Sequence, residues 1–150
     1  MENFMSFTFE NVIEMWKTDA TINENKIPFE ITRTPLLHAK YLEIFMVAKA
    51  KLIVAEKNYN RMKWVKRKYF RGELEKHELD QYGWSQWQGL KPSLSELNEL
   101  FDADRELNDL SEKVKYYQSF VSGIEYIMKQ IQGRDWTLKT LSEHLRWTNG

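Results

Sequence analysis

The chain has 150 residues, with 22 Lys and Arg side chains against 22 Asp and Glu, so its net charge is near zero. It contains no cysteine, which excludes disulfides, a thiol nucleophile and thiolate metal sites. The longest fully apolar run covers only residues 44–48, too short to span a membrane. We expect a single helical domain over residues 1–150, without a signal peptide and located in the cytoplasm.

Gly and Pro are sparse, and the long intervals between them predict an all-α fold with long helices. Residues 7–17 have apolar side chains at helical spacing. Thr34 and Pro35 are a favourable N-cap and first residue for a helix that reaches Gly72. Its apolar stripe comprises Leu37, Tyr41, Ile44, Ala48, Leu52, Ala55, Tyr59 and Met62. The next stripe position is Lys66, so we expect this end of the helix to leave the core and face a partner.

Residues 83–95 combine Gly, Pro and two Trp residues and predict a loop. We expect Trp84 and Trp87 to pin this loop to the long helix, and stacking on nucleobases is the alternative. Ser93, followed three residues later by Glu96, forms a capping box for the next helix.

The most regular pattern of the chain is an apolar seam that begins at Leu100 and Ala103 and alternates steps of three and four residues. We assign oligomerisation to its main part, which comprises Leu107, Leu110, Val114, Tyr117, Val121, Ile124, Met128 and Ile131. Such a seam is typical of a coiled coil, either between copies of the chain or in an antiparallel hairpin with the first long helix. Gly133 ends this helix, and a last amphipathic segment follows. We therefore divide the domain into residues 1–82, which carry a basic helix, and residues 93–150, whose helices associate.

Charge is sorted along the chain. Residues 49–71 hold nine Lys and Arg side chains and one Glu, a net charge of +8, whereas residues 73–112 have a net charge of −8. Cations mixed with aromatic rings favour single-stranded DNA, because phosphates need cations and unpaired bases can stack on rings. Two alternatives are a solvated helix face and pairing between the basic and acidic segments.

The candidate DNA-binding residues lie near the end of the long helix. Of these, Lys57, Arg61, Trp64 and Lys68 recur on one helical face, whereas Trp64 and Phe70 could instead belong to the core. The complete set comprises Lys57, Arg61, Lys63, Trp64, Lys66, Arg67, Lys68, Tyr69, Phe70 and Arg71.

Catalytic patterns are absent from the sequence. No Gly-rich phosphate loop occurs, and His38, His77 and His144 lie far apart. Asp102 and Asp104 are two residues apart and would not face each other on a helix. We expect no enzymatic activity, no cofactor and no metal site.

The order and spacing of several motifs resemble the UvsY recombination mediator proteins of T-even-like bacteriophages over almost the full length. The residues that carry the resemblance are Trp16 and Asp19, Pro35 to Tyr41, Lys68 to Gly72, Asp102 to Asp104, Lys115 to Gln118, Arg134 to Lys139, and Trp147. The family's DNA-binding motif is a short Lys/Arg stretch leading into an aromatic pair, which falls here on residues 66–70. Lys68 departs from the familiar version of this motif, which has an acidic residue at that position.

The resemblance implies a DNA-recombination and repair protein that acts in recombination-dependent replication and is not an enzyme. It would bind single-stranded DNA and load a RecA-like phage recombinase onto strands covered by the phage single-stranded-DNA-binding protein. It also implies self-association into a ring, a hexamer or heptamer, through the C-terminal helices. The alternative function is a coiled-coil scaffold whose basic and acidic segments pair between subunits.

Overall fold

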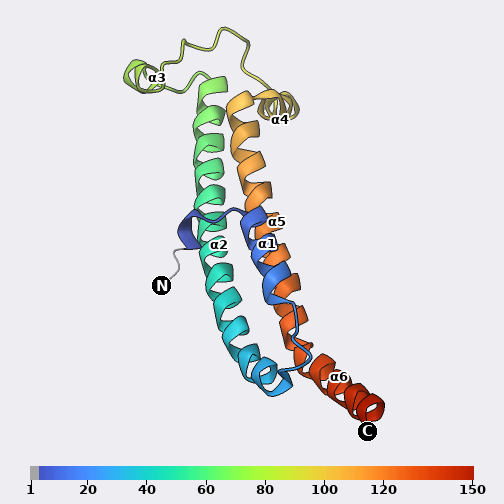
Figure 1. Cartoon of the computed structure of the whole chain (residues 1–150). Helices are drawn as coiled ribbons and strands as arrows, with labels where there is room; N and C mark the ends of the chain where they lie inside the picture. The colour runs from blue at the N-terminus through green and yellow to red at the C-terminus, as the bar shows by residue number, and fades with distance from the viewer. Residues whose placement is uncertain (1–3) are drawn as a thin grey trace. The chain divides into compact units, whose positions relative to one another are not determined.

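The computed structural model describes residues 4–150, and every regular element in that range is helical (Figure 1). The predicted all-α fold is thus confirmed. A short 3-10 helix, η1 (Phe4–Ser6), precedes α1 (Phe9–Asp19), α2 (Ile27–Phe70), α3 (Lys76–Tyr82), α4 (Leu94–Ala103), α5 (Arg105–Gln132) and α6 (Arg134–Asn149). None of the helices in this range is long and apolar enough to cross a membrane.

The chain divides into two compact units, and each combines segments that are distant in sequence. Unit 1 contains residues 1–50 and 118–150, and unit 2 contains residues 51–117. Helices α2 and α5 each contribute to both units. The division of function between residues 1–82 and 93–150 remains a prediction.

The predicted start of the long helix at Thr34 and Pro35 is wrong, because α2 begins at Ile27 and holds Pro35 inside it. A proline in a helix interior removes a backbone hydrogen bond. The Glu30 carbonyl, one turn earlier, accepts hydrogen bonds from the Thr34 hydroxyl at 3.3 Å and from the Arg134 guanidinium at 3.3 Å. These contacts hold the backbone one residue before Ile31, whose carbonyl is the one that lacks a donor because Pro35 has no amide hydrogen.

The predicted uninterrupted seam from Leu100 to Ile131 is also wrong, because Asp104 separates α4 from α5. Asp104 has extended backbone angles, and its carboxylate accepts a hydrogen bond from the Leu107 amide at 2.9 Å. This is N-cap geometry, for which Asp is a preferred residue. The predicted capping box at the start of α4 is confirmed, since Ser93 and Glu96 exchange both hydrogen bonds.

The core of unit 1 is formed by α1, the first half of α2, the end of α5 and the start of α6. Val12, Tyr41, Ile124 and Leu138, one from each helix, are fully buried. Asp19 at the end of α1 fixes α2, since its carboxylate lies 2.8 Å from Lys40 Nζ and accepts a hydrogen bond of 2.9 Å from the Tyr41 hydroxyl. Several residues that carry the family resemblance therefore hold this fold together.

The core of unit 2 is a cluster at the end of α2. Phe70 packs there with Leu97, Phe101 and Leu107 from α4 and α5. The predicted apolar stripe of α2 reaches this cluster through Tyr59 and Met62, which are partly buried. The end of α2 therefore stays within the core instead of leaving it.

Candidate nucleic-acid interface

Four of the predicted DNA-binding residues share one open face of α2 in unit 2, and a fifth follows the end of the helix. Lys57, Arg61, Trp64 and Lys68 follow one another at steps of three or four residues, which places them on one side of the helix, and Arg71 comes directly after its last residue. We call this set of five residues the exposed basic face. Four of them are exposed, and Lys68 is partly buried. Arg71 also forms a surface ion pair with Glu73 at 3.0 Å.

Trp64 and Lys68 form the centre of this face. Trp64 is 57% exposed, and Lys68 Nζ lies 4.1 Å from its ring centroid. The ring thus lies open to solvent with a cation beside it. Single-strand-binding surfaces combine these two features, since the cation meets a phosphate and the ring offers a stacking surface for a base.

Arg67 and Lys63 flank the exposed basic face. Arg67 is exposed, whereas Lys63 is partly buried with its ammonium 5.4 Å from the ring centroid of Phe101 and 5.8 Å from that of Tyr59. The Lys63 ammonium therefore lies near two aromatic rings of unit 2.

Lys66 is not at the surface, which corrects the prediction that the seam becomes open to a partner at this residue. Only 8% of Lys66 is exposed, and its ammonium lies 3.1 Å from the Asp104 carboxylate and 3.3 Å from that of Glu106. It also lies 4.1 Å from the ring centroid of Trp84. A buried ammonium requires such charge partners, and here they come from the acidic segment of the same chain.

The aromatic pair at the end of α2 packs inward. Phe70 is buried, and Tyr69 is partly buried with its hydroxyl donating a 2.7 Å hydrogen bond to the Ser85 carbonyl. The Trp84 ring centroid lies 5.1 Å from that of Tyr69, and the Trp87 centroid lies 5.0 Å from that of Phe70. The prediction that both tryptophans pin the loop to the long helix is therefore confirmed.

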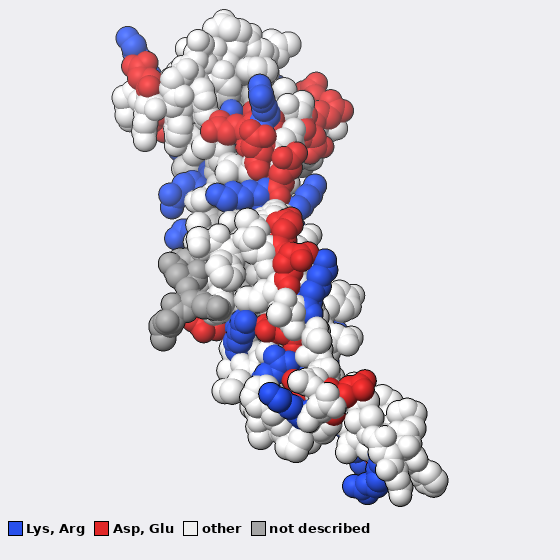
Figure 2. Space-filling view, viewed as in Figure 1, with Lys and Arg blue, Asp and Glu red and all other residues white. Residues whose placement is uncertain are grey.

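Acidic side chains also lie at the surface of unit 2. Figure 2 shows Asp and Glu side chains gathered over α4 and the start of α5, close to Lys and Arg side chains of the same unit. Part of the sorted charge is thus balanced within unit 2. The exposed basic face lies outside the Lys66 ion pairs and keeps its cations at the surface.

The seam proposed for oligomerisation is largely covered by this chain. Leu107, Val121, Ile124 and Ile131 are buried, and the remaining members, Leu110, Val114, Tyr117 and Met128, are partly buried. This burial agrees with the antiparallel hairpin, one of the two arrangements that the pattern allowed. Participation of the seam in self-association remains a prediction.

Unit 1 contains a buried charged network that the sequence patterns did not predict. The Arg134 guanidinium binds the Glu30 carboxylate and donates a 3.0 Å hydrogen bond to the Thr34 hydroxyl, and all three residues are buried. Arg33 binds the same carboxylate and donates to the Asp19 and Thr21 carbonyls. Burial raises the pKa of the Glu30 carboxyl, but the hydrogen bonds from Arg33 and Arg134 outweigh it, and the pKa is lowered.

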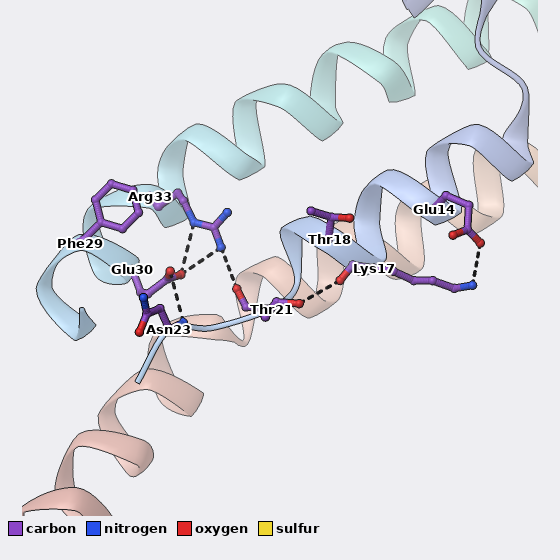
Figure 3. A pocket seen from close by; sticks show the side chains of 8 residues that line it. All are labelled: Glu14, Lys17, Thr18, Thr21, Asn23, Phe29, Glu30 and Arg33. Carbon is purple, nitrogen blue, oxygen red and sulfur yellow. Dashed lines mark hydrogen bonds and ion pairs between the residues drawn. The ribbon is translucent and has the colours of Figure 1, made fainter. Parts of the chain in front are cut away.

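A groove beside this network, between α1 and the start of α2, is not a separate site (Figure 3). Its charged side chains already bind one another, since Arg33 holds Glu30 and Lys17 lies 2.7 Å from Glu14. The groove therefore belongs to the contacts that join the two helices.

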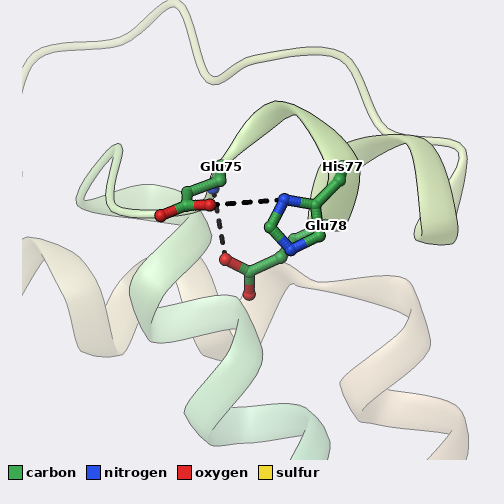
Figure 4. A group of neighbouring side chains, drawn as sticks. All are labelled: Glu75, His77 and Glu78. Atoms are coloured by element: carbon green, nitrogen blue, oxygen red, sulfur yellow. Dashed lines mark hydrogen bonds and ion pairs between the residues drawn. The ribbon is translucent and has the colours of Figure 1, made fainter.

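Glu75, His77 and Glu78 place one potential metal-ligand atom each within 4.8 Å of one another (Figure 4). His77 Nδ1 lies 3.3 Å from Glu75 Oε2, and the Glu75 amide donates a 3.3 Å hydrogen bond to the Glu78 carboxylate. The capping of α3 and a surface contact explain this cluster, and no further observation indicates a metal.

Comparison with known proteins identifies the family. The sequence model of the family described as "Recombination, repair and ssDNA binding protein UvsY" matches residues 15–150. The chain belongs to the UvsY family. Its membership places it among recombination and repair proteins that bind single-stranded DNA. A search of curated protein sequences finds no match.

Solved structures of the bacteriophage T4 recombination mediator protein UvsY share the fold of this UvsY family member. The lattice type II crystal structure is 17% identical and has a TM-score of 0.81, with 96% of this chain and 99% of that chain covered. The lattice type IV structure is 16% identical, with a TM-score of 0.81 and coverage of 94% and 99%. At these identities the likeness confirms the helical fold.

Proposed function

We propose that this protein is a recombination mediator that binds single-stranded DNA without catalysing a reaction. The observation that carries the proposal is the exposed basic face of α2 in a member of the UvsY family, with Lys68 4.1 Å from an open Trp64 ring. Its cations can neutralise phosphates, and Trp64 can stack on an unpaired base. Lys66 and Phe70 are buried, so they support the fold beneath this face and do not contact the DNA.

The mediator would load a RecA-like phage recombinase onto strands covered by the phage single-stranded-DNA-binding protein, in the cytoplasm of the host cell. Similarity to the T4 recombination mediator supports this role.

Self-association, as a hexamer or heptamer, would multiply the modest DNA site of one subunit, because linked sites bind one strand with a raised effective concentration. We place this association on the C-terminal helices. The partly buried seam members of α5 are available there, and Trp136 and Trp147 on α6 are 72% and 88% exposed.

A loading assay tests the proposed function. An oligonucleotide is first covered with the single-stranded-DNA-binding protein, and the DNA-dependent ATPase activity of the recombinase is then followed after addition of this protein. A mediator shortens the lag before ATP hydrolysis, and a variant with Arg61, Lys68 and Arg71 changed to Gln does so poorly. A lag that wild-type protein leaves unchanged, with an oligomer that dissociates in salt, would favour the scaffold function.

A further inference from the structure

A second surface feature of unit 2 lies beside the exposed basic face. A groove of about 380 Å³ runs between α2, the end of α3 and the start of α5. Its apolar lining comes from Met62, Val65 and Leu110, which are partly or fully buried. Arg61 belongs both to this groove and to the exposed basic face, so a strand bound on that face would pass its edge.

One wall of the groove ends a stack of aromatic rings. Tyr82 lines the groove and stacks on Trp84, with ring centroids 4.5 Å apart and planes 19° apart. Trp84 does not line the groove and lies 4.1 Å from the Lys66 ammonium. Tyr82 is thus the ring of this stack that borders the open space, so a planar base that enters there would meet an aromatic side chain.

The two long sides of the groove carry complementary polar groups. Arg61 and Asn58 stand on α2, and Glu106 and Asp109 stand on α5. A guanidinium donates to acceptor atoms at a base edge, and a carboxylate accepts from amino and imino N–H groups. A carboxylate beside a phosphate-binding face is unfavourable for the backbone itself, so these acids suit a base edge better than a phosphate.

We propose that this groove binds a single nucleobase of the bound strand and favours guanine. The inference rests on the proposed binding of single-stranded DNA. Guanine alone among the four bases offers two adjacent N–H donors, N1 and N2, to one carboxylate, and its O6 and N7 atoms accept from an arginine. Asp109 is the principal acceptor, because Glu106 also binds Lys66 at 3.3 Å. Tyr82 supplies the stacking surface.

Three 15-nucleotide strands test the site by fluorescence anisotropy at one salt concentration: thymidine throughout, and the same strand with three isolated dG or three isolated dA residues. Isolated guanines cannot form quadruplexes. We expect the dG strand to bind roughly tenfold tighter than the other two, since one good bidentate pair discriminates by about that factor. Replacement of dG by deoxyinosine, which lacks the N2 amine, should remove most of the preference without any change to the protein.

Protein variants complete the test. D109N should remove the preference for the dG strand over the other two strands, and Y82L should weaken binding of the dG strand. D102N is the matched control, because Asp102 is an exposed acid of unit 2 outside the groove, and it should keep the preference. Equal affinity of wild-type protein for the three strands, or a preference that survives in D109N, would overturn the proposed binding of guanine in the groove and leave the proposed DNA binding intact. Absence of binding to any strand would instead overturn the proposed function.

Discussion

The Lys66 ammonium lies 3.1 Å from the Asp104 carboxylate, and each side chain is only 10% exposed. This pair joins the most basic stretch of the chain to the residue that separates α4 from α5. Asp104 also caps α5 through the Leu107 amide, so one carboxylate serves both the helix start and the buried cation. Lys66 thus stabilises the fold on which the exposed basic face is built.

The first prediction separates Lys66 from its neighbour Lys68. K66M should lower the free energy of unfolding by about 3 kcal/mol, because it leaves the Asp104 carboxylate buried without a cation. K68M removes a partly exposed cation and should change stability by less than about 1 kcal/mol. Urea unfolding measures both. Equal stabilities of K66M and wild-type protein would show that the Lys66 pairs are not maintained in solution.

The buried network of unit 1 gives a second prediction. R134M should lower the free energy of unfolding by about 3 kcal/mol, because it leaves Glu30 with one of its two guanidinium partners. R146M on the same helix removes an exposed cation and serves as the control. The double variant E30M/R134M should recover part of the loss, since it removes both buried charges. A double variant that shows the sum of two large losses would argue against a coupled pair.

Stability should also depend on pH through Glu30. The pKa of this carboxyl is lowered from its ordinary value of 4.5. Because the unfolded state then binds a proton more readily than the folded state, the stabilisation by Glu30 is complete above about pH 4.5. It is lost as the pH falls through the lowered folded pKa. The stability difference between wild-type protein and E30Q should therefore shrink on acidification, and a difference that stays constant to pH 3 would contradict this role.

Gly123 provides a packing prediction. A Cβ atom at this position would lie 2.2 Å from the Phe9 ring, and Phe9 itself packs on Phe120 with centroids 5.3 Å apart. G123A should destabilise the protein by about 1–3 kcal/mol, since the ring must move out of a filled site. S122A, at the exposed neighbouring position, is the control for thermal unfolding. A G123A melting temperature equal to that of S122A would show that Phe9 is free to move.

The sequence predicted those features that depend on local pattern. The stripe from Leu37 to Met62 is buried or partly buried as its periodicity indicates, and the capping box of Ser93 and Glu96 forms. Contacts between residues far apart in the sequence could not be predicted from local patterns. Arg134 and Glu30 are 104 residues apart, and with Thr34 they form a buried network beside Pro35.

In the candidate DNA-binding site, too, local spacing was predictable from the sequence and long-range contacts were not. Spacing alone placed Lys57, Arg61, Trp64 and Lys68 on one face, and that face is open. Lys66 has the same charge as its neighbours, and only the fold of α4 and α5 brings Asp104 and Glu106 to it. The position of Tyr82 beside the groove likewise depends on its stacking on Trp84.

Fluorescence anisotropy with single- and double-stranded oligonucleotides across a salt series tests DNA binding most directly. We expect tighter binding of the single strand, with a logarithmic affinity that falls linearly with logarithmic salt concentration. Changing Arg61, Lys68 and Arg71 to Gln should reduce the slope by about 2, because each phosphate contact on a single strand contributes roughly 0.7. Changing Lys17, Lys129 and Lys139 of unit 1 to Gln should leave it nearly unchanged. An unaltered slope in the first triple variant, or no binding of single strands at low salt, would contradict DNA binding by the exposed basic face.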